Sequence, residues 1–496
     1  VHNLITTDNL GFIYINGSTA SFTNIATSGT HQSEMTGTSS RFFAKFNSDG
    51  ERIWGTYHPV GGQDMIIDNQ YNIVVCGVTN DSISNFTDSN SYQQTYTGGG
   101  SEAYLYKFSP LGIRLWATYY GGEGGDHFMA VNIDDDDNIY VVGNTYSNNN
   151  ITSPGAYLET RDSAPNSGNT AILIKFNPNG HRIWGTYYYK MGSPSQSDFR
   201  TIDIDSTGNI ILSGYAYNQE DFPTNRCIII FDIYGEMLED FFYNGPTGFR
   251  SKIVGDFLYL GLQDGISPNF QHIKKYDLVN KQFIWTYGVQ GNAVRGFGVN
   301  SQGNVFYSGK TIYYNNDTSI TTPNSFMPIS PNDFEKAFLL KLDTNGEKEW
   351  GTYYGGNKEE TYNRLAIGFQ DEIYLFGTTH SDQGISTSGA FQEEKGSGDW
   401  STYLVKFEGC ESEAEINNFG TFCIGNNLQL TANGGTNYLW TGPNGFVSTE
   451  QNPVIPDATI DNEGFYSCYI SGGLTCYGSF LTYMEAGINI SSPPIL

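Results

Sequence analysis

One phrase recurs five times along this chain and constrains its fold more than any other feature. A strand-like run ending in Lys and a large apolar residue leads to a short turn, and Trp and Thr-Tyr follow that turn. Four close copies and one worn copy (274–287) are present at residues 44–57, 106–119, 174–187, 274–287 and 340–353. Internal repeats of this kind indicate an architecture built from similar units. Their spacing favours a repeated sheet over a helical solenoid.

A second element, a polar turn followed by an apolar strand that ends in Gly, occurs seven times. Its final residues are Gly17, Gly77, Gly143, Gly214, Gly261, Gly309 and Gly377. The lysine-type strand also occurs seven times, at residues 42–46, 103–108, 171–176, 227–232, 272–277, 337–343 and 402–408. The sequence therefore divides into seven units.

Each unit can be read as four strands in chain order. Strand A is short and apolar, strand B ends in Gly, strand C carries the lysine, and strand D carries Trp and Thr-Tyr. A fixed offset between the end of strand C and the Trp fixes the register of a C–D hairpin. The hairpin glycines suit a positive-φ position, and they are Gly50, Gly112, Gly180, Gly235 and Gly346. Seven such sheets predict an all-β fold, a seven-bladed β-propeller over residues 1–409.

Two of the units depart from the pattern. Strand D appears six times, because the seventh unit stops after TYLVKFEG. We expect the missing strand to come from sequence before Val1, or this blade to remain three-stranded. The unit with the lysine-type strand at 227–232 lacks a Trp, and we expect Phe241-Phe242 to take its place.

Three of the repeated phrases together resemble a known propeller repeat. They are AKF-x-x-x-G-x-x-x-W-G-T-Y, the G-G-x-x-x-D segment that ends at Asp126, and the D-x-x-G-N segment from Asp205 to Asn209. They resemble the SBBP repeat of secreted bacterial proteins, many of them from Bacteroidota, and the resemblance covers roughly residues 1–409. It implies a propeller but little about function, because propellers host many unrelated activities.

The charge of the chain narrows the classes of partner. There are 52 Asp and Glu residues against 25 Lys and Arg residues, which gives a net charge of −27. This charge repels phosphate groups and argues against nucleic-acid binding. It fits a soluble extracellular surface or a protein that binds divalent cations. The longest apolar runs are too short for a transmembrane helix. The chain opens with Val1 and shows no signal peptide, so we expect a processed product or a fragment.

The pattern changes from Cys410 onward. The order Cys423, Trp440 and Tyr466-Ser467-Cys468 resembles an immunoglobulin-like (Ig-like) β-sandwich. We assign this module to residues 410–490 and treat residues 491–496 as a linker or tail.

The Ig-like resemblance implies a disulfide between Cys423 and Cys468, with Trp440 packed against it. Cys410 and Cys476 then form a second bridge. Four cysteines within so short a stretch indicate an oxidising compartment, and the alternative is four unpaired thiols in a reduced β domain. The remaining cysteines are predicted to be buried free thiols, and they are Cys76 and Cys227.

The combination of SBBP-type repeats and an Ig-like module is typical of substrates of the type IX secretion system. The resemblance therefore implies a secreted or bacterial cell-surface protein that meets this secretion machinery during export. It also implies Asp-Ser-apolar sites of O-glycosylation, for which Ser82 and Ser163 are candidates.

The acidic run at 134–137 is the clearest candidate for a metal site. Ca²⁺ prefers several carboxylate and carbonyl oxygens, so the candidate ligands are Asp134, Asp135, Asp136 and Asp137. The alternative is that the run is only the A–B turn, which is rich in Asp and Asn in the other units.

No catalytic or cofactor-binding residues are predicted. The seven histidines form no metal-ligand pattern, and they are His2, His31, His58, His127, His181, His272 and His380. No Gly-x-Ser-x-Gly motif is present in the sequence. Residues 303–311 resemble a phosphate-binding loop but have one residue too many between the glycines, so we interpret Lys310 as structural.

The repeated Trp and Tyr residues are predicted to form core and inter-blade contacts rather than a glycan site. Recognition is expected at the variable B–C loops, because binding loops vary on a rigid scaffold, and these are residues 81–101, 144–170, 311–336 and 378–401. The leading hypothesis is a non-enzymatic, secreted or cell-surface protein for binding, adhesion or assembly, with the Ig-like module as a spacer. Its partner would be a surface or outer-membrane protein or an extracellular glycan. The alternatives are a polysaccharide lyase or glycosidase with its site at the propeller mouth, and a propeller fragment of a longer surface fibre or gliding adhesin.

Overall fold

The structure is a computed structural model of the chain. It describes residues 3–487, except for gaps at 36, 162–167, 191–194, 219–225, 245–246, 264–269, 291, 312–319, 323–324, 328–333, 388, 397, 408–414, 417–419, 434–436 and 472–477.

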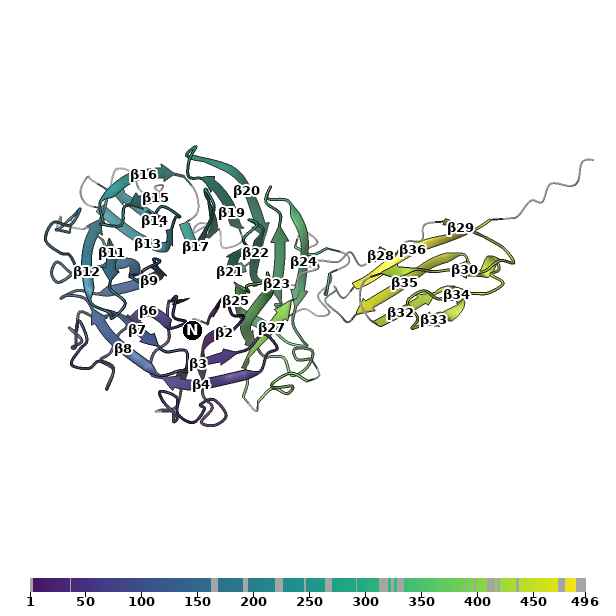
Figure 1. Cartoon of the computed structure of the whole chain (residues 1–496), viewed down its shortest axis with the longest axis horizontal. Helices are drawn as coiled ribbons and strands as arrows, with labels where there is room; N and C mark the ends of the chain where they lie inside the picture. The colour runs from purple at the N-terminus through teal and green to yellow at the C-terminus, as the bar shows by residue number, and fades with distance from the viewer. Residues whose placement is uncertain are drawn as a thin grey trace, which may run out of the picture.

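Strands β1–β27 form seven antiparallel sheets that are arranged as blades in a ring (Figure 1). Within the described residues, six blades have four strands and the seventh has three. Each sheet follows the chain order, so that strand A is innermost and strand D is outermost. The predicted seven-bladed β-propeller is therefore confirmed.

The strands of the first four blades have the following bounds. Blade 1 has β1 (Leu4–Thr7), β2 (Ile13–Thr19), β3 (Ser40–Phe46) and β4 (Arg52–His58). Blade 2 has β5 (Asp64–Ile67), β6 (Ile73–Thr79), β7 (Glu102–Phe108) and β8 (Arg114–Tyr120). Blade 3 has β9 (Asp126–Ile133), β10 (Ile139–Thr145), β11 (Thr170–Phe176) and β12 (Arg182–Tyr188). Blade 4 has β13 (Ser195–Ile204), β14 (Ile210–Asn218), β15 (Arg226–Phe231) and β16 (Met237–Tyr243).

The other three blades complete the ring. Blade 5 has β17 (Thr247–Val254), β18 (Phe257–Gln263), β19 (Phe270–Asp277) and β20 (Gln282–Gln290). Blade 6 has β21 (Asn292–Val299), β22 (Val305–Lys310), β23 (Ala337–Leu342) and β24 (Lys348–Tyr354). Blade 7 has β25 (Glu360–Ile367), β26 (Ile373–Thr379) and β27 (Ser401–Phe407).

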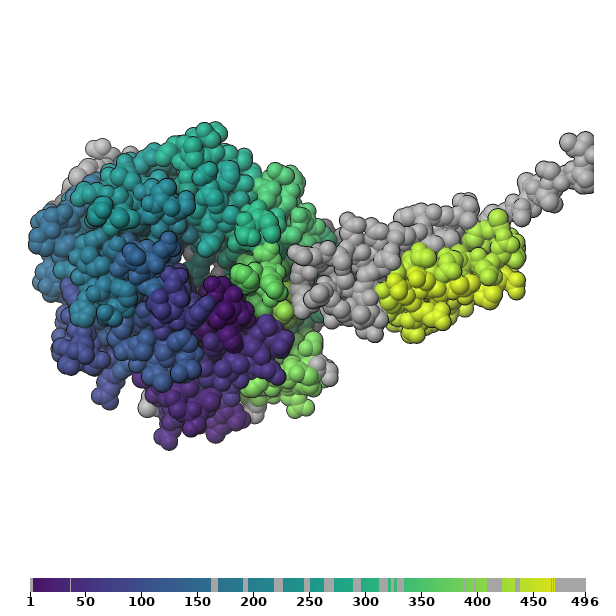
Figure 2. Space-filling model, viewed as in Figure 1, coloured from purple at the N-terminus to yellow at the C-terminus, as the bar shows by residue number. Residues whose placement is uncertain are grey.

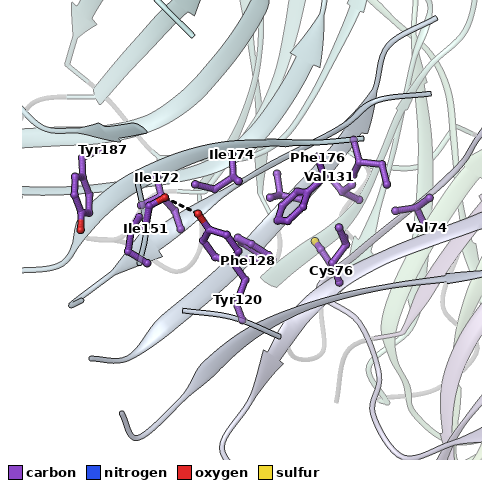
Figure 3. Packing of buried hydrophobic residues seen from close by; sticks show 14 residues of the cluster. Val74, Cys76, Tyr120, Phe128, Val131, Ile151, Ile172, Ile174, Phe176 and Tyr187 are labelled. Carbon is purple, nitrogen blue, oxygen red and sulfur yellow. Dashed lines mark hydrogen bonds between the residues drawn. The ribbon is translucent and has the colours of Figure 1, made fainter. Parts of the chain in front are cut away.

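The hydrophobic core lies between neighbouring blades. Figure 3 shows the cluster between blades 2 and 3, to which Cys76 of β6, Val131 of β9 and Ile174 of β11 belong. Strands such as β10 are buried along their whole length, because both faces of the sheet pack against other blades. Cys76 and Cys227 are buried free thiols, as predicted.

The C–D hairpins have the predicted register. The strand C lysine pairs with the strand D Trp, as Lys175 does with Trp184, and a bulge follows directly. The five predicted hairpin glycines all have positive φ, and they are Gly50, Gly112, Gly180, Gly235 and Gly346.

Each strand D Trp connects its blade to the next one. The Trp116 indole N–H donates to the carbonyl oxygen of Pro178, 3.1 Å away in the C–D hairpin of blade 3. A Cβ placed on Gly180 of that hairpin would lie 2.8 Å from the Trp116 ring. The same donor, carbonyl and glycine arrangement is formed by Trp54 with Pro110 and Gly112, Trp184 with Ile233 and Gly235, and Trp285 with Thr344 and Gly346. These contacts confirm the predicted inter-blade role of the Trp residues.

Blade 4 corrects one prediction. Phe241-Phe242 does not take the position of the Trp, because Glu239 lies opposite Ile230 where the other blades pair Trp with Lys. The Glu239 carboxylate instead forms an ion pair with Lys281 in the C–D hairpin of blade 5. An ion pair therefore replaces the indole contact at this boundary.

The ring closes between blades 7 and 1. Strand β1 contacts both β5 and β25, and the Thr7 hydroxyl donates to the carbonyl oxygen of Ile367 at 2.6 Å. Within the described residues, blade 7 has no strand D, which leaves β27 as an open sheet edge.

The C-terminal strands lie outside the ring (Figure 1). Their largest sheet has the order β29-β36-β35-β32-β33. These strands are β29 (Gly420–Cys423), β32 (Asn437–Gly442), β33 (Phe446–Ser448), β35 (Gly464–Ser471) and β36 (Gly478–Gly487). Shorter pairs are formed by β28 (Glu415–Ile416) with β31 (Ala432–Asn433), and by β30 (Leu428–Gln429) with β34 (Val454–Ile455). Trp440, Tyr466 and Cys468 belong to the buried cluster of this region.

The predicted Cys423–Cys468 disulfide is not formed in this structure. Cys423 pairs with Gly487 and Cys468 with Phe480, and both partners lie on β36. The two positions are separated along that strand by about 23 Å at a rise of ~3.3 Å per residue. A disulfide needs Cα atoms within about 7 Å. Cys410 and Cys476 lie outside the described residues.

Candidate functional site

The predicted recognition loops all lie at one end of the blades. Because successive strands are antiparallel, the B–C loops and the D–A links share one face of the ring. The A–B turns and C–D hairpins share the opposite face. Loops at one face of a rigid scaffold are a common place for binding residues.

A repeated set of hydrogen bonds anchors the B–C loop to strand D in blades 1, 2, 3 and 6. In blade 3 the Leu158 backbone N–H donates to the Thr186 hydroxyl at 3.0 Å, and the Tyr187 N–H donates to the Leu158 carbonyl at 3.2 Å. The Thr of the Trp-x-Thr-Tyr phrase thus holds the loop. Equivalent pairs are Gln32 with Thr56, Gln93 with Thr118, and Met327 with Thr352.

The parts of the loops between these anchors are exposed. In the blade 2 loop, Phe86 is buried and packs against Tyr119, whereas Ser82 and Ser89 are exposed. The glycosylation candidate Ser82 is therefore on the surface, and its modification stays a prediction. The second candidate, Ser163, lies outside the described residues.

The ring also has a cavity at its centre, which we call the central channel. Strands A line a volume of about 450 Å³ there, and Figure 2 shows the N-terminal residues at the centre of the ring. The charged lining consists of Asp64, Asp203, Arg200, Arg250, Lys252 and Arg364. Cations thus outnumber carboxylates in the channel, although the whole chain carries a charge of −27.

Most of the channel charges have partners. Arg250 lies 3.3 Å from Asp64 across the ring, from blade 5 to blade 2. Arg200 lies 2.9 Å from Asp198. Burial raises the pKa of Asp203 to about 6, and the Ser251 hydroxyl donates to its carboxylate. This arrangement can hold an anionic group but shows no nucleophile paired with a base.

The acidic run at 134–137 forms the A–B turn of blade 3. Asp134 accepts hydrogen bonds from the Asn138 side chain at 2.9 Å and the Tyr140 hydroxyl at 3.0 Å, and lies 3.4 Å from Lys175. Asp137 is buried at positive φ and accepts from the Asn69 backbone of blade 2 at 2.9 Å. Asp135 and Asp136 are exposed. Among the described residues, no group of three or more His, Cys, Asp or Glu residues is arranged to hold a metal ion. The turn role is therefore the one the geometry supports, and calcium binding stays a prediction.

The turn carboxylate has the same structural role in other blades. Asp68 of blade 2 lies 2.6 Å from Lys107, and both side chains are buried. Asp205 accepts from the Asn209 side chain at 3.1 Å. The strand C lysine and the A–B turn Asp thus connect two strands of one blade, a contact that sequence reasoning missed.

Two of the histidines and Lys310, all considered above from the sequence, make contacts within the fold. His31 and His58 lie together, with ring centroids 5.7 Å apart. Burial lowers the pKa of His58 to about 3 and that of His31 to about 4, so both rings are neutral at pH 7. Lys310 ends β22 and forms an ion pair with Glu335 at 2.5 Å, so the phosphate-loop resemblance has no support here.

No helix within the described residues is long and apolar enough to span a bilayer. No family model matches the chain, and no match was found among curated proteins.

The chain is a seven-bladed β-propeller, and solved propellers are among the structures similar to it. The WD40 β-propeller domain of Doa1 has 9% identity and a TM-score of 0.39, covering 74% of this chain and 86% of that one. The Dos1 propeller has 10% identity and a TM-score of 0.36, covering 84% and 90%. A chain of the mitotic checkpoint complex has 8% identity and a TM-score of 0.40, covering 75% and 86%. Similarity at this level indicates nothing about ligand or activity.

Proposed function

We propose that this protein is a non-enzymatic, secreted or cell-surface protein for binding and assembly. Its B–C loops present the recognition surface. The observation that carries this proposal is the repeated loop anchor: the Thr of each Trp-x-Thr-Tyr phrase holds a loop whose exposed residues differ from blade to blade. Rigid anchors with variable tips are typical of binding surfaces.

The resemblance of the repeats to SBBP repeats supports a secreted protein of Bacteroidota that the type IX machinery exports. In this proposal the C-terminal strands are an Ig-like spacer, which the buried Trp440 and the Tyr466 hydroxyl bond to the Asn462 carbonyl at 2.9 Å support. The partner is a surface protein or an extracellular glycan.

The test compares two faces of the ring. The chain is applied to a glycan array and to immobilised outer-membrane proteins of a Bacteroidota species, alongside two variants. Ser89→Arg with Thr95→Arg alters exposed positions of the blade 2 loop, and Asp135→Ala with Asp136→Ala alters exposed positions of the opposite face.

We expect saturable binding that the loop variant weakens at least tenfold and the opposite-face variant leaves unchanged. Equal loss in both variants, or binding to neither array, would contradict the loop proposal. Turnover of an arrayed polysaccharide by the chain would contradict the non-enzymatic part.

A further inference from the structure

A groove lies along the open edge of blade 7, where it meets blade 1. Its volume is about 630 Å³. The lining comes from β27, the blade 7 B–C loop and the C–D hairpin of blade 1, and includes Leu404, Lys406, Ile385, Gln392, Ser48 and Gly50. The groove includes part of the blade 7 B–C loop and is distinct from the blade 2 loop positions altered above.

The exposure of β27 distinguishes it from the strands C of the other blades. In β3, β7, β11 and β23 the last apolar residues are buried, because strand D covers that edge. In β27, Leu404, Val405 and Phe407 are only partly buried. An open edge with apolar side chains is a template for an added strand.

The hairpin of blade 1 offers the surface that the other hairpins use for a Trp. In four hairpins the glycine at positive φ lies against a Trp ring from the preceding blade, at 2.6–3.1 Å from a Cβ placed there. Gly50 has φ +82 and nothing within 4 Å of that position. Ser48 precedes Gly50 by the same two residues that separate Pro178, the indole acceptor, from Gly180.

The blade 7 loop also has the groups that hold a strand D elsewhere. In blade 3, the Arg182 guanidinium donates to the Ile151 carbonyl at 3.0 Å, and the Tyr120 hydroxyl donates to the same oxygen (Figure 3). In blade 7, Tyr354 donates to the Ile385 carbonyl at 2.6 Å, so Ile385 is the counterpart of Ile151. Gln392 occupies the loop position that binds the strand D Thr in other blades.

We propose that this edge is an acceptor site for an extended peptide with the pattern basic–apolar–Trp–Gly/Ala–Thr–Tyr, supplied by a partner polypeptide. Among the described residues, all six strands D are already paired within their own blades, so none of them can supply the peptide. The peptide adds antiparallel to β27 by β-augmentation, in which backbone hydrogen bonds give affinity and side-chain pockets give specificity.

The internal repeat fixes the register of the added strand. Lys45, Lys107, Lys175, Lys275 and Lys341 each pair with a Trp. The peptide Trp therefore lies opposite Lys406, rests on Gly50, and donates its indole N–H to the carbonyl of Ser48. The peptide Thr lies opposite Leu404, within reach of the Gln392 backbone.

The test uses the whole chain and a labelled synthetic peptide that copies residues 180–190, GHRIWGTYYYK. Fluorescence anisotropy measures binding, and hydrogen–deuterium exchange follows residues 401–407. We expect saturable binding, slower exchange at 401–407 on peptide addition, and at least tenfold weaker binding of a peptide whose Trp is replaced by Ala.

The protein variants separate docking from folding. Gly50→Ala places a methyl group where the indole rests, so peptide affinity should fall at least tenfold. Gly29→Ala is the matched control, because Gly29 has φ +86 and open space around it but lies outside the groove; it should bind as the parent does. Absence of saturable binding up to about 1 mM, equal binding by Gly50→Ala, or protection, before peptide is added, of those β27 amides that point away from β26 would overturn the proposal. None of these outcomes tests binding at the blade 2 loop, so failure of this proposal and failure of the proposed function are distinguishable.

Discussion

The Trp-on-glycine contact between blades predicts a specific difference between two identical substitutions. Gly180 and Gly50 occupy equivalent hairpin positions with φ +79 and +82. A Cβ at Gly180 would lie 2.8 Å from the Trp116 ring, whereas a Cβ at Gly50 meets nothing within 4 Å.

The magnitudes follow from two separate terms. Holding Ala in the left-handed region costs about 1–2 kcal/mol at either position. Overlap with a packed ring adds about 1–3 kcal/mol at Gly180 alone. The entropy that Ala removes from the unfolded chain is the same in both variants, so it cancels in the comparison. We expect Gly180→Ala to lower the free energy of unfolding by about 1–3 kcal/mol more than Gly50→Ala does.

The assay is urea unfolding of the chain and both variants, followed by circular dichroism and by Trp fluorescence. Coincident transitions from the two probes are required before free energies are compared. Equal destabilisation, within about 0.5 kcal/mol, would refute the argument that the indole occupies the space above Gly180. A larger effect at Gly50 would refute it as well.

Three further predictions concern buried titratable groups. The lowered pKa of His58, about 3, lies below the unfolded value of ~6.5, so the folded state loses stability as pH falls below 6.5. Urea titrations should show a loss by pH 5 that is about 2 kcal/mol smaller in His58→Phe than in the parent, because the variant keeps the contribution of His31. The pH dependence of stability due to Asp203 has the opposite sign, because burial raises its pKa to about 6 from 3.8. The stability of the folded state therefore falls as pH rises through 4–6 and the carboxyl group ionises. The free energy of unfolding of Asp203→Asn, relative to that of the parent, should rise by up to about 3 kcal/mol between pH 4 and pH 7.5. Lys107→Met leaves the Asp68 carboxylate buried without its cation and should cost about 3–5 kcal/mol, whereas adding Asp68→Asn should restore part of the loss in a double-mutant cycle. Additive single effects in that cycle would argue against the ion pair as the source.

The sequence predicted the ring because its signals are local and repeated. The offset from Lys175 to Trp184 is contained in one hairpin, so its five copies specify the strands and their register together. The role of Gly180 as a turn residue follows from the same hairpin. Its second role, beneath Trp116 of another blade, involves residues 64 positions apart, and no local pattern specifies such a contact.

The errors of the sequence reading have separate origins. Glu239 follows Phe231 by the same eight residues that separate Trp184 from Phe176, and the hairpin bulge is the same in both blades. The aromatic residues nearby were taken as the substitute on residue type, although the offset already indicated Glu239. The Cys423–Cys468 bridge rested on the order of residues along the chain, whereas the interposed strand β36 keeps the two cysteines apart. The channel charges and the His31–His58 pair come from strands or loops that are distant in sequence, so composition alone gave no signal for them.

The boundary between blades 7 and 1 has a consequence for how the molecule opens. Four other boundaries have an indole-to-carbonyl bond from strand D to the next C–D hairpin, and the one between blades 4 and 5 has an ion pair there. Among the described residues neither of these strand D contacts occurs between blades 6 and 7 or between blades 7 and 1. The second of these boundaries is also the one with an open strand edge, where strand β1 and contacts such as Thr7 with Ile367 close the ring. Partial unfolding proceeds through the least stabilised contiguous unit of a protein. The ring is therefore expected to come apart from this seam first, and native-state hydrogen exchange should report the lowest opening free energies in β1 and β27.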